Sequence, residues 1–225
     1  MLFRSAFDSE TMGANMNFGI PLTEYNFLSS SIGVESTSLD CQAFVSSTCT
    51  DFITEFGEDR FTTLRWANRF SYDTRNDAIF PTRGMLHSVE AEVALPFLGD
   101  SLEFYKLEYA TQLFTNILED YVFLFRANLG YGDGYSKNQS LPFFENFYAG
   151  GPRSVRGYEE YTLGPLDQAT QRPIGGNVKL VGGTEVILPV PFLREMKSLR
   201  VTGFFDAGNV YDDNIDLGQL RYSVG

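Results

Sequence analysis

Few residues of this chain could carry out covalent chemistry. His87 is the only histidine, so a Ser–His–Asp nucleophile or a histidine general base would have to use it. The segment around it, MLHSVEAEV, alternates like a strand and offers no evident partner, so we expect His87 to be a surface or interfacial residue. No serine lies in a nucleophile elbow, and no His/Cys cluster has zinc-ligand spacing. The sequence therefore predicts no enzyme, no catalytic residue, no metal and no cofactor.

Two cysteines could form a disulfide. Cys41 and Cys49 lie in LDCQAFVSSTCTDFITEFGED, and in an oxidising compartment we expect them to pair and to staple this segment. Two free thiols are the alternative that the spacing leaves open. Phe44, Phe52 and Phe56 fall on one helical face, which predicts a short helix that packs locally within the segment.

A third candidate is the stretch FYAGGPRSVRGYEEYTLGP, residues 147–165, which combines glycines with two arginines. A guanidinium that leaves bulk water needs a carboxylate partner, which it binds best in bidentate fashion. Gly150, Gly151 and Gly157 would let the backbone turn tightly and approach another element closely. The alternative is that Arg156 is simply an exposed loop residue.

The elements around these candidates are strands. In YVFLFRANLGYG, residues 121–132, aromatic and aliphatic side chains alternate with polar ones such as Arg126 and Asn128. The same alternation recurs at 12–22, 63–72, 85–96, 101–116 and 198–211. Strands of about ten residues with charges of both signs on one face are typical of an antiparallel transmembrane β-barrel, apolar outside and polar inside. A soluble sandwich or lipocalin-like barrel is the alternative all-β fold.

The connections between these strands alternate in length. Short ones are predicted at 21–25, 76–84, 116–120 and 189–197, and the others at 8–11, 39–60, 97–101, 133–176 and 211–219. Counting up and down along the chain places the second set at one end, as extracellular loops are placed in outer-membrane barrels. Both the cysteines and the arginine-bearing stretch then lie at that end.

The amino-acid composition excludes some classes of partner and of protein. The net charge of -12 argues against nucleic acid, because a polyphosphate binder needs a basic face. Aromatic residues make up 15% of the chain, as is usual for outer-membrane barrels and secreted β proteins. No run approaches eighteen apolar residues, which excludes a transmembrane helix. The start, MLFRSAFDSE, has no apolar signal-peptide core, so an exported protein would be represented here by a mature fragment.

The segment FFENFYAGGPRSVRGYEEYTLGP resembles the hallmark of the BamA family of outer-membrane protein assembly factors, whose long sixth extracellular loop folds back into the barrel. The family's VRGF/Y loop tip is matched here by Val155, Arg156, Gly157 and Tyr158. The segments GYGDG, DTRNDAIFPTRG, EFYKLEY and FFDAGNVYDD extend the resemblance over essentially the whole chain.

This resemblance implies a sixteen-stranded barrel, of which about nine or ten strands are present. Residues 1–225 would be a partial C-terminal barrel domain, without the periplasmic POTRA domains, the first strands and the last strands. Neither side of the family's barrel seam would then be included. Glu185 and Asp206 match the family positions that receive the tip arginine, and strand alternation turns both inward. We therefore expect Arg156 to pair with them inside the barrel.

The function that the resemblance implies is the folding and insertion of β-barrel proteins into the Gram-negative outer membrane. The implied partners are unfolded outer-membrane β-barrel proteins as substrates, outer-membrane lipids, and assembly-complex lipoproteins that bind through the missing periplasmic domains. TamA-like barrels, two-partner-secretion transporters and passive porins are the alternatives.

Overall fold

The structure is a computed structural model that describes residues 7–41, 46–96, 101–118, 121–136, 138, 140–188 and 200–225. Phe44, the short connection predicted at 189–197 and most of the loop predicted at 97–101 lie outside these residues. The described residues form an all-β architecture with one α-helix and two single-turn 3-10 helices.

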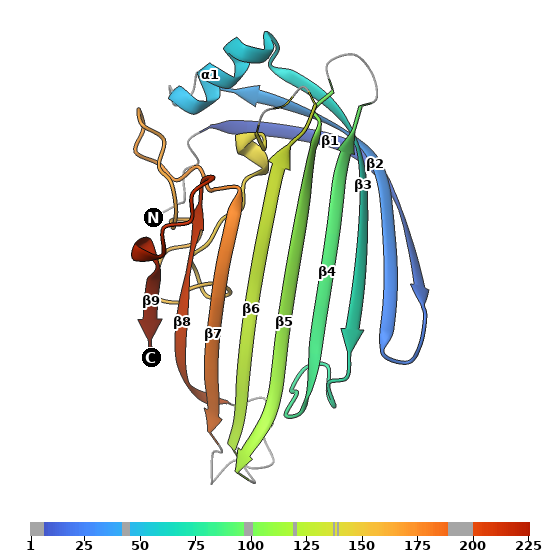
Figure 1. Ribbon diagram of the computed structural model, residues 1–225, viewed down its shortest axis with the longest axis vertical. Helices are drawn as coiled ribbons and strands as arrows, with labels where there is room; N and C mark the ends of the chain where they lie inside the picture. The colour runs from blue at the N-terminus through green and yellow to red at the C-terminus, as the bar shows by residue number, and fades with distance from the viewer. Residues whose placement is uncertain are drawn as a thin grey trace.

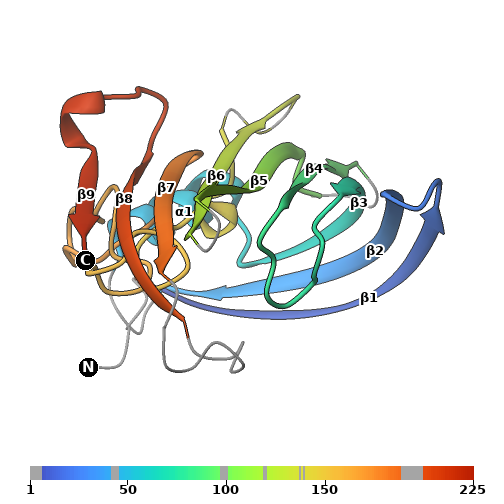
Figure 2. The same ribbon diagram turned by 90° about the horizontal axis from the view of Figure 1, so that it is seen from below.

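Nine strands form one sheet in which each strand pairs antiparallel with the next along the chain. Figures 1 and 2 show the sheet bent into part of a cylinder, with β1 and β9 as its two edges. The strands are β1 (Asp8–Pro21), β2 (Asn26–Asp40), β3 (Arg60–Asp73), β4 (Gly84–Leu95), β5 (Phe104–Leu118), β6 (Tyr121–Gly134), β7 (Val178–Leu188), β8 (Val201–Tyr211) and β9 (Arg221–Val224). The predicted all-β antiparallel fold with about nine or ten strands is confirmed.

The two faces of the sheet differ as the alternation predicts. On β6, Phe125 and Leu129 are exposed on the convex face, whereas Arg126 lies between them in sequence and points to the concave face. Exposed aromatic and aliphatic side chains continue this convex apolar surface on the other strands, for example Met16, Trp66, Leu107 and Phe205. None of the helices in the described part of the chain is long and apolar enough to cross a membrane.

The concave face is not uniformly polar. Phe114, Val122, Leu124 and Ile187 form a buried apolar cluster. Leu124 is two residues from Arg126 and therefore lies on the same, inward side of β6. The expected polar interior is therefore found in the middle of the sheet, around Arg126, whereas the end opposite α1 is apolar on its concave face.

The connections that the structure describes in full lie as predicted, with one exception. The β2–β3, β6–β7 and β8–β9 connections are at the end that carries α1, and the β1–β2 and β3–β4 turns are at the opposite end (Figure 1). The prediction that residues 8–11 form a connection is wrong, because these residues belong to β1 and pair with the end of β2. Alternation on β2 extends to Asp40, and β1 has a backbone partner along that whole length.

The predicted helix and disulfide are both present in the β2–β3 connection. Helix α1 (Ser47–Phe56) begins after Ser46, whose hydroxyl accepts a hydrogen bond from the backbone N–H of Cys49 at 3.3 Å. Gly57 ends the helix in the left-handed conformation, at φ 75°. Cys41 and Cys49 form a disulfide with their Cα atoms 5.5 Å apart, which confirms the pairing and rules out free thiols.

Replacing both cysteines by serine is expected to loosen α1 without unfolding the sheet. A disulfide that closes a loop of this size stabilises it by on the order of 2 kcal/mol. Amide hydrogen exchange of α1 should therefore accelerate about 30-fold, since 1.4 kcal/mol corresponds to a factor of ten. Exchange of the β5 and β6 amides should not change, and a global acceleration would contradict this local role.

His87 lies on a strand as expected, but it has side-chain partners that the sequence did not indicate. It lies on β4, and its Nδ1 is 2.8 Å from the Tyr109 hydroxyl and 3.0 Å from the Thr111 hydroxyl. Its ring also stacks between those of Tyr72 and Tyr109. The prediction that His87 has no partner is therefore wrong, and the pairing of β4 with β5, which brings His87 opposite Thr111, explains the difference.

Candidate functional site

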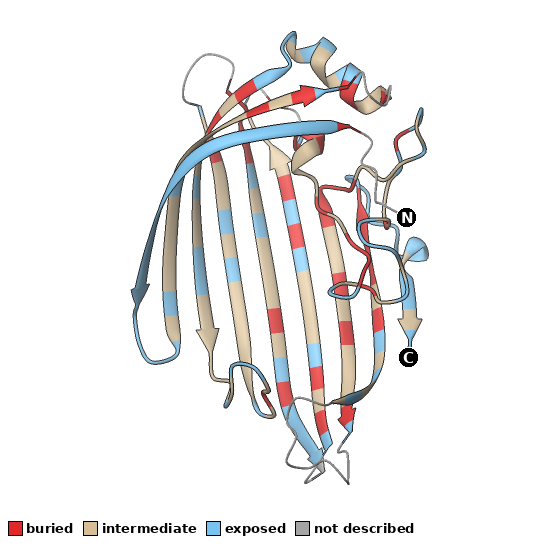
Figure 3. Ribbon diagram, turned by 180° about the vertical axis from the view of Figure 1, so that it is seen from behind, coloured by how far each residue is buried: buried red, intermediate tan, exposed pale blue. Residues whose placement is uncertain are grey.

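The β6–β7 loop, residues 135–177, connects β6 to β7 at the α1 end and folds back over the concave face of the sheet (Figure 3). Isolated backbone bridges hold its passes together, pairing Ala149 with Leu163 and Phe147 with Gly176. Its side chains Val155 and Leu163 pack against Val181 of β7 and Val210 of β8 in one buried cluster. The loop is thus attached to the inner wall of the sheet.

The turn that brings Arg156 to the wall depends on glycine. Gly150, Gly151 and Gly157 have φ angles of 105°, 91° and 86°, which side chains rarely permit. A Cβ atom on Gly150 would also lie 2.4 Å from the carbonyl oxygen of Glu159. The glycine positions singled out in the sequence therefore have backbone conformations that other residues rarely adopt.

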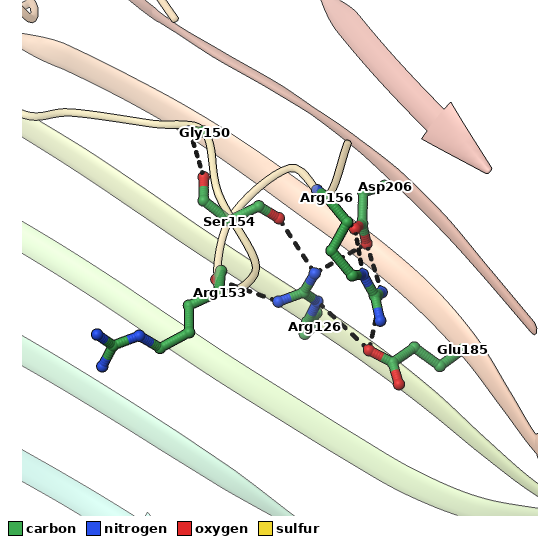
Figure 4. A network of polar contacts seen from close by, with 7 residues as sticks. All are labelled: Arg126, Gly150, Arg153, Ser154, Arg156, Glu185 and Asp206. Carbon is green, nitrogen blue, oxygen red and sulfur yellow. Dashed lines mark hydrogen bonds and ion pairs between the residues drawn. The ribbon is translucent and has the colours of Figure 1, made fainter. Parts of the chain in front are cut away.

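Arg156 binds Asp206 in bidentate fashion (Figure 4). Its Nε donates to Oδ2 at 2.6 Å, its Nη2 donates to Oδ1 at 2.8 Å, and its backbone N–H donates to Oδ2 at 3.2 Å. The Asp206 side chain has no exposed surface. A fully buried carboxylate needs such compensation, because loss of hydration costs several kcal/mol per ion.

Glu185 completes the surroundings of Arg156. Its Oε1 lies 2.9 Å from Nη2 of Arg156. The Arg156 guanidinium also lies 3.7 Å from the ring centroid of Phe204. Phe204 is the β8 residue that pairs with Glu185 in the sheet. The structure thus brings together the three residues that the sequence singled out as an ion-paired group.

Arg126 is a member of this group that the sequence analysis did not select. Its Nη2 donates to Oδ1 of Asp206 at 2.9 Å, and its Nε lies 3.8 Å from Glu185. The same guanidinium donates to the backbone carbonyl groups of Arg153 and Ser154, each at 3.1 Å (Figure 4). We call Arg126, Arg156, Glu185 and Asp206 the tip lock. It has two positive and two negative charges, so it is neutral as a whole.

Gly183 makes the tip lock sterically possible. In the sheet register Arg126 lies opposite Gly183, and Gly183 lies opposite Asp206, so the two charged side chains meet across the glycine. A Cβ atom on Gly183 would be 2.3 Å from Oδ1 of Asp206 and 3.2 Å from Nε of Arg126. Alternation on β6 was a signal for an inward Arg126, but the role of Gly183 follows only from the register.

Replacing Gly183 by alanine is expected to displace the Asp206 carboxylate and to weaken the lock, at a cost of about 1–3 kcal/mol for overpacking. Gly182→Ala is the matched control, since a Cβ there meets its nearest atom at an ordinary 3.6 Å. Limited trypsin digestion after Arg156 should be about tenfold faster in the first variant and unchanged in the second. Equal acceleration in both would mean that alanine perturbs β7 and not the lock.

The other two residues of the tip pack instead of pairing. Val155 is fully buried in the cluster between the loop and the β7–β8 wall, and Tyr158 packs against the same cluster. The Tyr158 hydroxyl donates to the carbonyl of Tyr222 on β9 at 3.4 Å. The tip therefore contacts β7, β8 and β9, and the two residues before it, Arg153 and Ser154, contact β6.

A second ion cluster holds the start of the loop. The 3-10 helix η1 (Phe143–Glu145) presents Glu145, and both of its carboxylate oxygens accept from the guanidinium of Arg65 on β3. Arg65 also pairs with Glu92 at 2.8 Å and with Glu35 at 2.9 Å. We call these four residues the base cluster. The loop is thus attached by charge at two separated walls, β3 near its start and β6–β8 at its tip.

These two groups combine opposite charges at contact distance and make no nucleophile–base pair. Arg126 and Arg156 donate to the carboxylate of Asp206, which lies on β8. Arg65 of β3 donates to the carboxylate of Glu145, which lies in the loop. Such an arrangement fixes one segment of the chain against another.

Residues 3–225 match the Omp85 superfamily domain. The chain is 31% identical to the outer membrane protein assembly factor BamA of Neisseria meningitidis serogroup B, over 92% of this chain and 28% of that protein. It is 32% identical to the sorting and assembly machinery component 50 homolog of Bos taurus, over 65% of this chain and 31% of that protein. The chain thus spans less than a third of these curated relatives.

A solved structure shares the fold. The crystal structure of Haemophilus ducreyi BamA lacking POTRA domains 1–3 superposes with a TM-score of 0.86 at 21% identity, covering 99% of this chain and 49% of that one. The nine-stranded curved sheet therefore has the architecture of part of that chain. From the match over residues 3–225 and this shared fold, the chain belongs to the Omp85 superfamily.

Proposed function

We propose that this chain is part of the C-terminal transmembrane β-barrel of an assembly factor that folds and inserts β-barrel proteins into the Gram-negative outer membrane. Two relatives named as assembly components support the proposal. The observation in the structure that carries it is the tip lock, in which Arg156 of a re-entering loop is bound by Asp206 and Glu185 of the wall.

The proposed mechanism requires no covalent step, so we propose that the protein is not an enzyme. The convex apolar surface contacts outer-membrane lipids, since side chains such as Phe125 and Leu129 are exposed there. The tip lock holds the loop against β6–β8, which keeps this wall in one shape while a substrate strand pairs at an open edge elsewhere in the full barrel. Unfolded β-barrel proteins are the substrates, and accessory lipoproteins bind other parts of the full protein.

A passive porin is a different class of function and is not favoured. A porin lumen must stay open to solutes, whereas here the β6–β7 loop covers the inner wall from β6 to β9. TamA-like and two-partner-secretion barrels are also not favoured, because one relative is named as an assembly factor and the other as an assembly machinery component.

Reconstitution separates these possibilities. The full-length protein in liposomes should accelerate the folding of an added unfolded outer-membrane barrel, measured as heat-modifiable gel mobility and protease protection of that substrate. Liposomes with a folded porin provide the control for nonspecific insertion. Solute flux without acceleration of folding would contradict the proposal in favour of a porin.

A further inference from the structure

Asp167 lies in the β6–β7 loop beyond the tip and has no exposed surface. It is not part of the tip lock or the base cluster. No arginine in the described part of the chain forms an ion pair with it, and a buried carboxylate of this kind must be stabilised by hydrogen bonds to its charged form. Its partners therefore show which element it holds.

Those partners lie in the first turn of α1. Oδ2 of Asp167 accepts from the Ser46 hydroxyl at 2.8 Å, the Ser47 hydroxyl at 3.1 Å, and both the backbone N–H and the hydroxyl of Thr48 at 3.1 and 3.0 Å. Oδ1 accepts from the backbone N–H and the hydroxyl of Thr170, each at 2.8 Å. One oxygen thus binds α1 while the other shapes the loop's own turn.

Burial disfavours the charged form of Asp167, but the hydrogen bonds from Thr48, Thr170 and Ser46 outweigh it and hold its pKa well below the usual range. Because the folded-state pKa is lowered, this stabilisation is present above the ordinary aspartate pKa and is lost only as the pH falls through the lowered value. The carboxylate therefore stays charged through neutral and mildly acidic conditions.

Two further contacts join α1 to the same loop. The Phe52 ring of α1 lies 5.4 Å from that of Phe143 and 5.7 Å from that of Phe144, both in η1 of the loop. Cys49 is fully buried in the same apolar cluster as Phe143, and its disulfide to Cys41 attaches the helix to the end of β2. Helix α1 is thus fixed to the sheet on one side and to the loop on the other.

Backbone contacts lead from Asp167 to the tip. The Leu166–Pro173 bridge adjoins Asp167, and the Leu163 N–H donates to the Ala149 carbonyl at 3.2 Å. The Gly150 N–H next to Ala149 donates to the Ser154 hydroxyl at 3.1 Å, two residues before Arg156. These contacts connect the part of the loop that holds Asp167 to the part that holds the tip.

We propose that Asp167 is a positioning residue for the tip lock, which it stabilises by clamping the β6–β7 loop to the first turn of α1. The β2–β3 connection thereby determines how firmly the re-entering loop stays on the wall. This inference deepens the proposed function, and its consequence for assembly rests on that function.

The test is trypsin digestion of the full-length protein in proteoliposomes, with cleavage after Arg153 and Arg156 measured by mass spectrometry. Asp167→Asn should accelerate cleavage at these two sites about tenfold or more. Ser47→Ala with Thr48→Val removes two of the hydroxyl groups that donate to Oδ2 and leaves the loop sequence, the Ser46 hydroxyl and the Thr48 backbone N–H in place. It should accelerate cleavage at the same two sites by a smaller factor. The double-mutant cycle should show strong coupling, because both changes break the same contact.

Thr54→Val is the matched control, because the exposed Thr54 hydroxyl donates to the Thr50 carbonyl within α1 and makes no hydrogen bond to the described part of the β6–β7 loop. Heat-modifiable gel mobility shows whether each variant barrel is folded. If Asp167→Asn does not fold, the variant with Ser47→Ala and Thr48→Val is used to test the proposal. Unchanged tip cleavage in that variant would overturn the proposal. No substrate barrel is present, so failure of the clamp is distinguishable from failure of the assembly function.

Discussion

Asp206→Asn is expected to abolish the insertion of substrate barrels by the full-length protein. The change removes the buried charge that both Arg156 and Arg126 bind, and it leaves two guanidinium groups facing one remaining carboxylate, Glu185. Breaking a buried ion pair in this way costs about 3–5 kcal/mol, which is at least about a hundredfold in the population of the locked tip. The measurement is the initial rate of substrate insertion into liposomes.

The charge swap that would test a simple pair has a different expected result here. Arg156→Asp combined with Asp206→Arg should not restore activity, because Nη2 of Arg126 lies 2.9 Å from the carboxylate that the new arginine would replace. Adding Arg126→Leu to the swap removes this repulsion and should recover part of the activity. Rescue by the two-residue swap alone would show that Arg126 is not part of the lock.

Glu160→Gln serves as the control for Asp206→Asn. Glu160 is an exposed carboxylate in the same loop, close to the tip. Its neutralisation changes the net charge by the same amount but breaks no buried pair, so insertion should stay near the wild-type rate. Wild-type activity of Asp206→Asn, or of Arg156→Ala, would contradict the requirement for the lock.

Arg65→Met is expected to have the second-largest effect. Arg65 is the common partner of Glu35, Glu92 and Glu145, so its loss leaves three carboxylates close together. The Nζ of Lys106, 3.5 Å from Glu145, then compensates them only in part. Repulsion between like charges and loss of the buried pairs should cost about 3–5 kcal/mol. We expect a lower midpoint for loss of heat-modifiable mobility, and faster proteolysis near Glu145 than elsewhere in the loop.

Arg69→Met is the matched control on the same strand and the same face. Its side chain is 54% exposed against 17% for Arg65, and it pairs with a single carboxylate, Glu90. Exposed pairs contribute about 0–1 kcal/mol, so stability should change little. A similar loss in both variants would show that the charge on β3, and not the base cluster, determines stability.

The architecture was largely predictable because strand alternation is a local property. The segment predicted at 63–72 lies within β3, and the one at 101–116 overlaps β5 almost completely. The inward positions of Glu185 and Asp206 follow from the same alternation. Their pairing with Arg156 came from the resemblance of the loop tip to a known family, since no periodicity links residues 50 positions apart.

The features that the sequence did not predict depend on strand register and on contacts between residues distant in sequence. Which residue of β6 lies opposite Gly183 is decided by pairing in space, so the role of Arg126 could not be inferred from a single strand. Asp167 binds α1 residues about 120 positions earlier, and nothing in the local sequence of either segment indicates the other. The partial apolar character of the concave face likewise emerged only when side chains of β5, β6 and β7 were brought together.

The shared carboxylate of the tip lock has a consequence for the order of folding. Arg126, Arg156 and Asp206 span 80 positions, and Asp206 meets Arg126 only after β7 has paired with both β6 and β8. Contacts with such sequence separation form late, because the loop-closure entropy must first be overcome. Asp206 can therefore bind both arginines only after β6, β7 and β8 have reached their final register.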